Sequence, residues 1–256
     1  MRKLSSCVLS FVLLFLTIIP SVGANASVSV VDTPIAYIDY LESLPNHSIA
    51  GLDAFNTSNE PERQEFIDGF KNLSEKDQQR FVDYLNDPEF AKKVYEAQPT
   101  DVLASKVTLF NGDVEVSSDV EFFDDIESNS NISLQAVGDS YFPYGKHTAT
   151  TTVMGLDIIK TSVYLHVEIK EVKKNTSQIV QILESGGIVD RNYYPALDLS
   201  KNESSAFLTS DKTLATKKVI WGWNFLWSGF GMVVGNREQW VQINKAGNIT
   251  GGAANL

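Results

Sequence analysis

The sequence predicts an α+β protein with a small helical N-terminal region followed by an antiparallel β-sandwich or barrel-like domain. Residues 33–98 repeat apolar side chains at the three- and four-residue spacing of amphipathic helices. Residues 141–256 instead hold short runs of alternating apolar and polar side chains, separated by glycine and asparagine turn signals. The chain has 256 residues and is 43% hydrophobic, which suffices for one large or two small packed domains.

Residues 1–26 have the three parts of a cleavable secretory signal peptide. A basic start at residues 1–3 precedes an apolar run at Val8–Ile19, and the small-residue triplet Ala24–Ala26 offers a cleavage site. The apolar run is short against the roughly 20 residues that cross a bilayer. We therefore expect a secreted, extracellular protein. The one cysteine, Cys7, leaves with the signal, and a disulfide-free secreted chain is more typical of a bacterium than of an animal.

Residues 27–99 are expected to be helical. Thr33 before Pro34 is a helix start, Ser74 has an acidic partner three residues on, and Asp87 before Pro88 starts another helix. The apolar stripes of the expected helices are Ile35, Ile38, Leu41 and Leu44; Phe66, Phe70 and Leu73; Phe81, Tyr84 and Leu85; and Phe90, Val94 and Tyr95. Such stripes predict a packed helical core or a docking surface.

Residues 100–140 are interpreted as an acidic linker or a propeptide junction. Acidic residues between Asp113 and Glu127 interleave with valine and phenylalanine, and a Ser-Asn run follows at residues 128–131. One acidic edge strand is the alternative. A calcium loop is not expected, because the spacing of oxygen ligands in such loops is missing.

Residues 141–256 are expected to form the antiparallel β domain. The clearest strand is Ser162–Lys170, where apolar and polar side chains alternate strictly. Lys174–Thr176 and Gly186-Gly187 are predicted turns. Further strands are expected at Gln178–Leu183, Lys217–Phe225, Phe230–Val234 and Glu238–Ile243.

The charge and the histidine content exclude several functions. A formal charge of −11 repels phosphate backbones, so nucleic acid is not an expected partner. Ser140 stands in a G-D-S triplet, but Tyr141 follows it where the trypsin-like form of that triplet needs a glycine, and no histidine lies beyond His166, where the other form needs its base. The three histidines are His47, His147 and His166. Their spacing also fits no zinc site, and no cofactor is expected.

All four tryptophans lie within the C-terminal part, three of them in Val219–Gly235, which reads V-I-W-G-W-N-F-L-W-S-G-F-G-M-V-V-G and carries no charge. Lysines precede this segment, and tryptophan favours membrane interfaces. The candidate membrane-contact residues are Trp221, Trp223, Phe225, Trp227 and Phe230. The alternative is that the segment forms the two central strands of a sandwich, with Trp221 and Trp223 on one core face.

Aromatic rings can also stack on sugars, and a third use of aromatic side chains in this region is carbohydrate recognition. Tyr193, Tyr194 and Trp240 are the candidates for that use.

The export signal, the acidic helical region and the lysine-flanked tryptophan segment together resemble the organisation of the large secreted bacteriocins of bacilli. The resemblance implies a Gram-positive source and a non-enzymatic antibacterial role at target-cell membranes, with no motif to transfer residue by residue. An acidic N-terminal half that acts as a removable shield would reconcile the net acidity of the chain with this membrane-directed role. A second hypothesis is an extracellular binding or structural module of the cell envelope or matrix. A third is a hydrolase that uses Ser140.

Overall fold

The computed structural model describes residues 31–45, 59–99, 105–124, 137–227 and 230–256, and at residues 59, 124, 227 and 230–233 the backbone alone. The expected signal peptide at residues 1–26 lies outside the described residues.

Four helices form the N-terminal part, as the sequence predicts: α1 (Pro34–Ser43), α2 (Asn59–Lys71), α3 (Glu75–Leu85) and α4 (Pro88–Glu96). The predicted caps are present. Thr33 Oγ1 accepts the Ala36 amide at 3.2 Å, and Ser74 Oγ accepts the Asp77 amide at 3.2 Å. These side chains start the helices by satisfying amides that have no partner within the helix.

The rest of the described chain is almost entirely strand. The strands are β1 (Ser105–Leu109), β2 (Val114–Asp124), β3 (Ser140–Tyr141), β4 (Pro143–Val153), β5 (Leu156–Lys173), β6 (Thr176–Asn192), β7 (Leu197–Glu203), β8 (Phe207–Leu208), β9 (Leu214–Trp227), β10 (Phe230–Asn244) and β11 (Ile249–Asn255). The two strands predicted at 230–234 and 238–243 are one strand, β10, which has a register shift between Val233 and Gly235.

The strands form two antiparallel sheets that pack face to face. The first sheet has the order β1-β2-β4-β5. The short strand β3 pairs with β5 on the same side as β4, and β6 pairs with the opposite side of β5. The second has the order β11-β10-β9-β7, with β8 also paired to β9. β10 packs on β4 and β5, and β9 packs on β5 and β6. The predicted α+β fold with an antiparallel sandwich is therefore confirmed.

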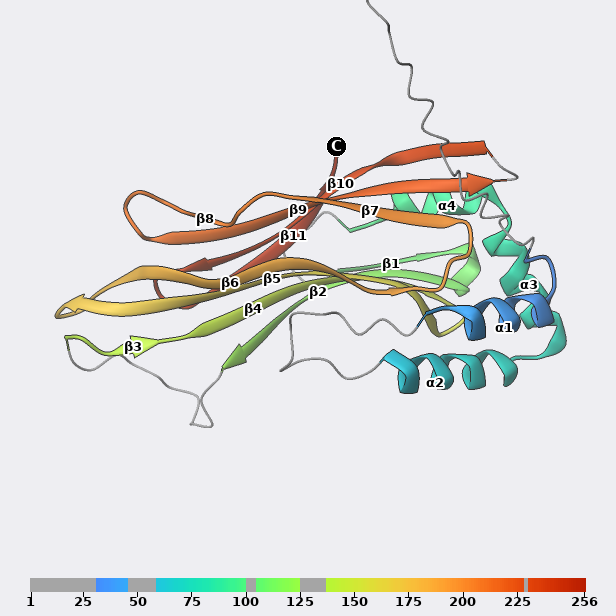
Figure 1. Cartoon of the computed structure of the whole chain (residues 1–256), viewed down its shortest axis with the longest axis horizontal. Helices are drawn as coiled ribbons and strands as arrows, with labels where there is room; N and C mark the ends of the chain where they lie inside the picture. Colours follow the sequence, from blue (N-terminus) through green and yellow to red (C-terminus); the bar gives the residue numbers. More distant parts are fainter. Residues whose placement is uncertain (1–30, 46–58, 100–104, 125–136, 228–229) are drawn as a thin grey trace, which may run out of the picture.

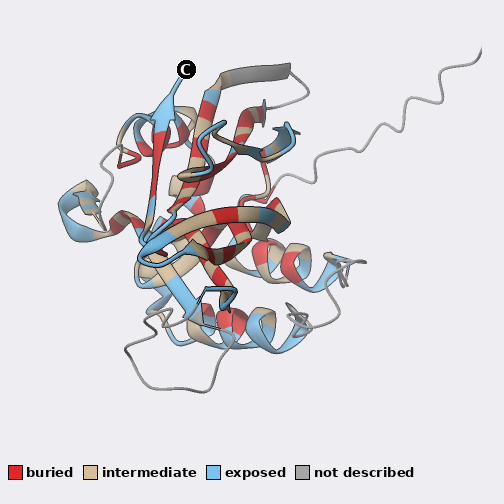
Figure 2. Ribbon diagram, turned by 90° about the vertical axis from the view of Figure 1, so that its left-hand side faces the viewer, coloured by how far each residue is buried: buried red, intermediate tan, exposed pale blue. Residues whose placement is uncertain are grey.

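One hydrophobic core joins the helices to both sheets. The helices gather at one end of the sandwich, and the tip of the β5–β6 hairpin lies at the other (Figure 1). The Tyr37 hydroxyl in α1 donates to the Tyr193 carbonyl at 2.9 Å, and the rings of Phe66 and Tyr193 lie 4.7 Å apart. Figure 2 shows buried residues on the helix faces that turn towards the strands. The helical region is thus part of the same packed unit.

The linker prediction for residues 100–140 is wrong for residues 105–124, which form β1 and β2. Val114 and Val116 are fully buried, while Glu115 lies on the opposite face and pairs with Lys106 at 2.5 Å. Acidic residues thus occupy the solvent face of β2, an inner strand that pairs with both β1 and β4. Residues 100–104 and 125–136 lie outside the described part, so the propeptide junction stays a prediction.

Candidate functional site

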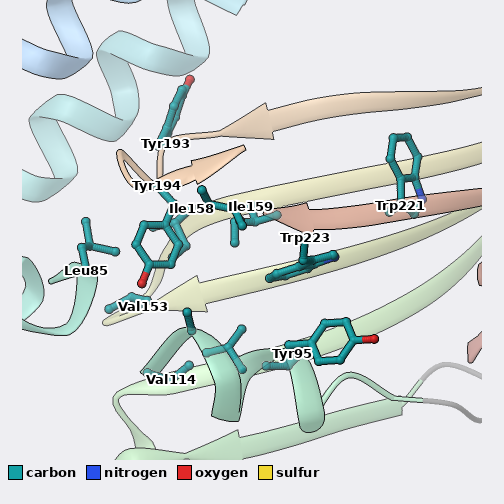
Figure 3. Close-up of a cluster of buried hydrophobic side chains, with 14 of the residues drawn as sticks. Leu85, Tyr95, Val114, Val153, Ile158, Ile159, Tyr193, Tyr194, Trp221 and Trp223 are labelled. Atoms are coloured by element: carbon teal, nitrogen blue, oxygen red, sulfur yellow. The ribbon is translucent and has the colours of Figure 1, made fainter. Parts of the chain in front are cut away.

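The tryptophan segment lies on the two central strands of the second sheet. Trp221, Trp223 and Phe225 alternate along β9 on its inner face and are 1%, 3% and 0% exposed. Trp223 packs edge-on against Tyr95 of α4, with ring centroids 5.8 Å apart (Figure 3). The core role predicted as the alternative for Trp221 and Trp223 is therefore confirmed.

A buried amide explains how the polar edge of Trp221 is accommodated. Gln239 of β10 is fully buried, and its Oε1 accepts hydrogen bonds from Trp221 Nε1 at 2.7 Å and from Thr161 Oγ1 at 3.0 Å. Its Nε2 donates to the His147 carbonyl at 2.9 Å and approaches His147 Nδ1 at 3.0 Å. Since Trp221 can only donate, this assigns the amide orientation and makes His147 Nδ1 an acceptor. The network ties the two sheets together at mid-core.

The charge state of His147 follows from this environment. The side chain is 1% exposed, and burial, assisted by the nearby charge of Arg237, lowers its pKa from 6.5 to about 4. The imidazole is therefore neutral at physiological pH.

The structure places only part of the predicted membrane-contact set. Trp221, Trp223 and Phe225 are core side chains, so they could meet a membrane only if the sandwich opened. Trp227 ends β9 and Phe230 begins β10, and their side chains lie outside the described residues. In the described chain, none of the helices is long and apolar enough to cross a membrane.

The three aromatic residues proposed for sugar stacking do not form one surface. Tyr193 and Tyr194 are 7% and 1% exposed, and both belong to the core that the helices cover. Trp240 is half-buried, and its ring lies over Gly252 of β11, where an added Cβ would come within 2.9 Å of it. That prediction is wrong for the two tyrosines.

Of the other residues considered for chemistry, Ser140 and His166 lie in the first sheet, and His47 lies outside the described residues. The Ser140 hydroxyl donates to Glu168 Oε1 on the neighbouring strand at 2.8 Å, so its proton is held by a carboxylate. His166 lies on the outer face of the first sheet, as expected, beside the ring of Tyr144. The described residues contain no group of three or more histidine, cysteine, aspartate or glutamate side chains that could hold a metal ion.

A pocket of about 480 Å³ lies where the space between the sheets opens at their β6 and β7 edges. It is lined by Ile182, Leu183, Glu184, Ser185, Glu203, Ser204, Ser205, Ala206 and Lys217. This volume is within the range of small-ligand sites, about 300 to 1,000 Å³. Three serines, two carboxylates and one ammonium group give it donors and acceptors of both kinds.

Glu203 is the fixed centre of this pocket. Its Oε1 accepts from Lys201 Nζ at 2.8 Å, and its Oε2 lies 3.1 Å from both Lys217 Nζ and the Gly187 amide nitrogen. Burial alone would raise the pKa of Glu203, but hydrogen bonds from the two lysines and their charges outweigh it and lower the pKa. Glu203 is therefore ionised and held in one orientation.

Lys217 reaches the pocket from the core side. It stands two residues before Val219 on the inner face of β9, and its side chain is only 4% exposed. Its Nζ also donates to the Ser204 carbonyl at 2.7 Å. A buried ammonium is tolerated here because it has a carboxylate partner and a carbonyl acceptor.

Glu184 is positioned from the outer face of the first sheet. The Tyr164 hydroxyl hydrogen-bonds to it, and burial together with the charges of Glu184 and Glu203 raises the pKa of Tyr164 to about 12. The Tyr164 ring lies across Gly186, where an added Cβ would meet its hydroxyl oxygen at 2.7 Å.

The Gly186-Gly187 pair lies inside β6, so the predicted turn is wrong. Gly187 faces the core, where an added Cβ would come within 2.7 Å of Val219. Because neither glycine has a Cβ, the Tyr164 ring can pack directly on the backbone at Gly186, and β9 can pack directly on the backbone at Gly187. The Gly187 carbonyl also accepts from Lys201 Nζ at 2.9 Å, so side chains of β7 satisfy the exposed edge of β6 at this point.

No protein-family model, curated protein or solved structure matches this chain. The resemblance to bacteriocins therefore stays a prediction.

Proposed function

We propose that the protein is a secreted, non-enzymatic binding module of the bacterial cell envelope or extracellular matrix. The observation that carries this proposal is the pocket at the β6 and β7 edges, whose carboxylate and ammonium groups are fixed in place by one another. Polar groups held in this way lose little freedom on binding, which favours recognition.

The chemistry of the pocket supports binding without turnover. Glu203 already accepts three hydrogen bonds, and neither histidine nor cysteine lines the pocket. A general acid or base needs a group that can exchange its proton near neutral pH. Glu203, kept ionised by its two lysine partners, does not meet that need.

The antibacterial function implied by the bacteriocin resemblance is the second candidate. It is favoured by Leu226, which is 41% exposed next to the charge-free β9–β10 hairpin end. In that case the hairpin end, rather than the buried Trp221 and Trp223, would contact the target membrane.

Co-sedimentation separates the two functions. The exported chain is mixed with isolated Gram-positive cell walls, or with vesicles of phosphatidylcholine and phosphatidylglycerol that hold a dye. Sedimentation with walls and no dye release supports the binding module. Dye release without wall binding would replace it with the membrane-directed function.

A further inference from the structure

We propose that the pocket between β6 and β7 binds a neutral sugar residue of an envelope or matrix glycan. This inference rests on the proposed binding function and names its ligand class.

The charge balance of the pocket selects a neutral ligand. Glu184 and Glu203 line the pocket together with Lys217, and Lys201 supplies a second ammonium group at Glu203. An anion would meet both carboxylates, and a cation would meet the buried Lys217. A ligand without charge meets neither penalty.

The hydrogen-bonding groups match a polyhydroxylated ligand. A sugar hydroxyl both donates and accepts, and the pocket offers acceptors on Glu184 and Glu203 together with the hydroxyls of Ser185, Ser204 and Ser205. Hydrogen bonds to ionised groups are stronger than those between neutral groups. The carboxylates would therefore set the orientation of the ring.

An apolar wall completes the match. Leu183 is 41% exposed and, with Ile182, lines the same pocket. The register of β5 and β6 shifts between the pairs His166–Glu184 and Val167–Ile182, so Leu183 is the extra residue of a β-bulge. Bulges re-aim side chains next to functional sites. Leu183 thus offers an apolar surface for the C–H face of a sugar ring.

The pocket also leaves room for a longer chain. Ser204 and Ser205 lie in the exposed connection between β7 and β8. A sugar bound against them could continue into solvent in at least one direction, as a unit of a polysaccharide must.

Titration calorimetry of the exported chain tests the inference with three tetrasaccharides. The two neutral probes are built from N-acetylglucosamine and from glucose, and the anionic probe is built from galacturonic acid. We expect at least one neutral probe to bind, and to bind more tightly than the anionic one.

Two variants test the location of binding. Glu184→Gln removes the charge of one acceptor and should weaken binding at least about tenfold. Ser205→Tyr fills the pocket from an exposed loop and should abolish binding. The matched control is Glu238→Gln, which changes a lysine-paired carboxylate on the other side of the second sheet. It should bind like the unchanged protein, and thermal unfolding confirms that each variant is folded.

Failure of both neutral probes, tighter binding of the anionic probe, or equal binding by Ser205→Tyr would each overturn the inference. Wall co-sedimentation keeps this failure separate from that of the proposed function. If walls are bound but neutral oligosaccharides are not, only the ligand class is wrong. If walls are not bound either, the binding module itself is wrong.

Discussion

Replacing the buried Gln239 by leucine should destabilise the protein far more than the same change at an outer-face position. The substitution nearly conserves volume but removes the amide that serves Trp221, Thr161 and His147. Each buried polar group left without a partner costs about 1 to 3 kcal/mol. The apolar leucine offsets part of this, so we expect a loss of about 2 to 4 kcal/mol, against a total stability of about 5 to 15 kcal/mol.

Gln242→Leu is the matched control, because Gln242 lies on the same strand. It is half-buried and makes one hydrogen bond, from its Nε2 to Thr216 Oγ1 at 3.1 Å. Its replacement should cost about 0.5 to 1.5 kcal/mol. Urea unfolding followed by far-UV circular dichroism measures both losses. Equal losses in Gln239→Leu and Gln242→Leu would refute the argument that the amide is a structural link between the sheets.

Three further predictions concern His147, Gly187 in β6 and the N-cap of α3. Burial lowers the pKa of His147 to about 4, so the unfolded chain binds a proton at this residue at a higher pH than the folded protein does. The stability that depends on the neutral imidazole is therefore complete above about pH 6.5 and is lost as the pH falls towards 4. The free energy of unfolding, measured with urea, should fall by up to about 3 kcal/mol over that range, and it should fall less in His147→Gln. An equal fall in the two proteins would contradict this. Gly187→Ala places a Cβ 2.7 Å from Val219 and should lower stability by about 1 to 3 kcal/mol in the same assay, so an unchanged midpoint would argue against the close approach. Ser74→Ala removes the N-cap of α3 and should cost about 1 kcal/mol, whereas no loss would mean that water replaces the cap.

The helices and the best strands could be predicted because their signals are local. The caps at Thr33, Ser74 and Asp87 lie within three residues of the amides they serve. Alternation in Ser162–Lys170 likewise names the buried face of β5 without knowledge of its neighbours.

The acidic strand β2 is harder to predict, because its many charged residues obscure the two-residue alternation of apolar and polar side chains. The valines that face the core are few, and glutamates and aspartates occupy the outer face between them. The turn predicted at Gly186-Gly187 is wrong for a related reason. A local turn signal cannot be told from a place where a ring and a strand approach the backbone, since both require the absence of a Cβ.

The pocket could not be predicted from the sequence, because its lining comes from β6, the β7–β8 connection and β9. One local signal was available in Lys217, a charged residue in phase with the buried Val219 and Trp221. A lysine at a core position requires a partner. That partner, Glu203, becomes identifiable only when the two sheets are packed together.

The claim that Trp221 and Trp223 are structural core is tested most directly by their fluorescence. A variant with Trp227→Phe and Trp240→Phe leaves these two as the only emitters, since the chain has four tryptophans. We predict a blue emission that resists quenching by acrylamide and does not change when phosphatidylglycerol-containing vesicles are added. Emission that is red and quenched in water but shifts to the blue with vesicles would contradict the account. It would mean that Trp221 and Trp223 contact the membrane.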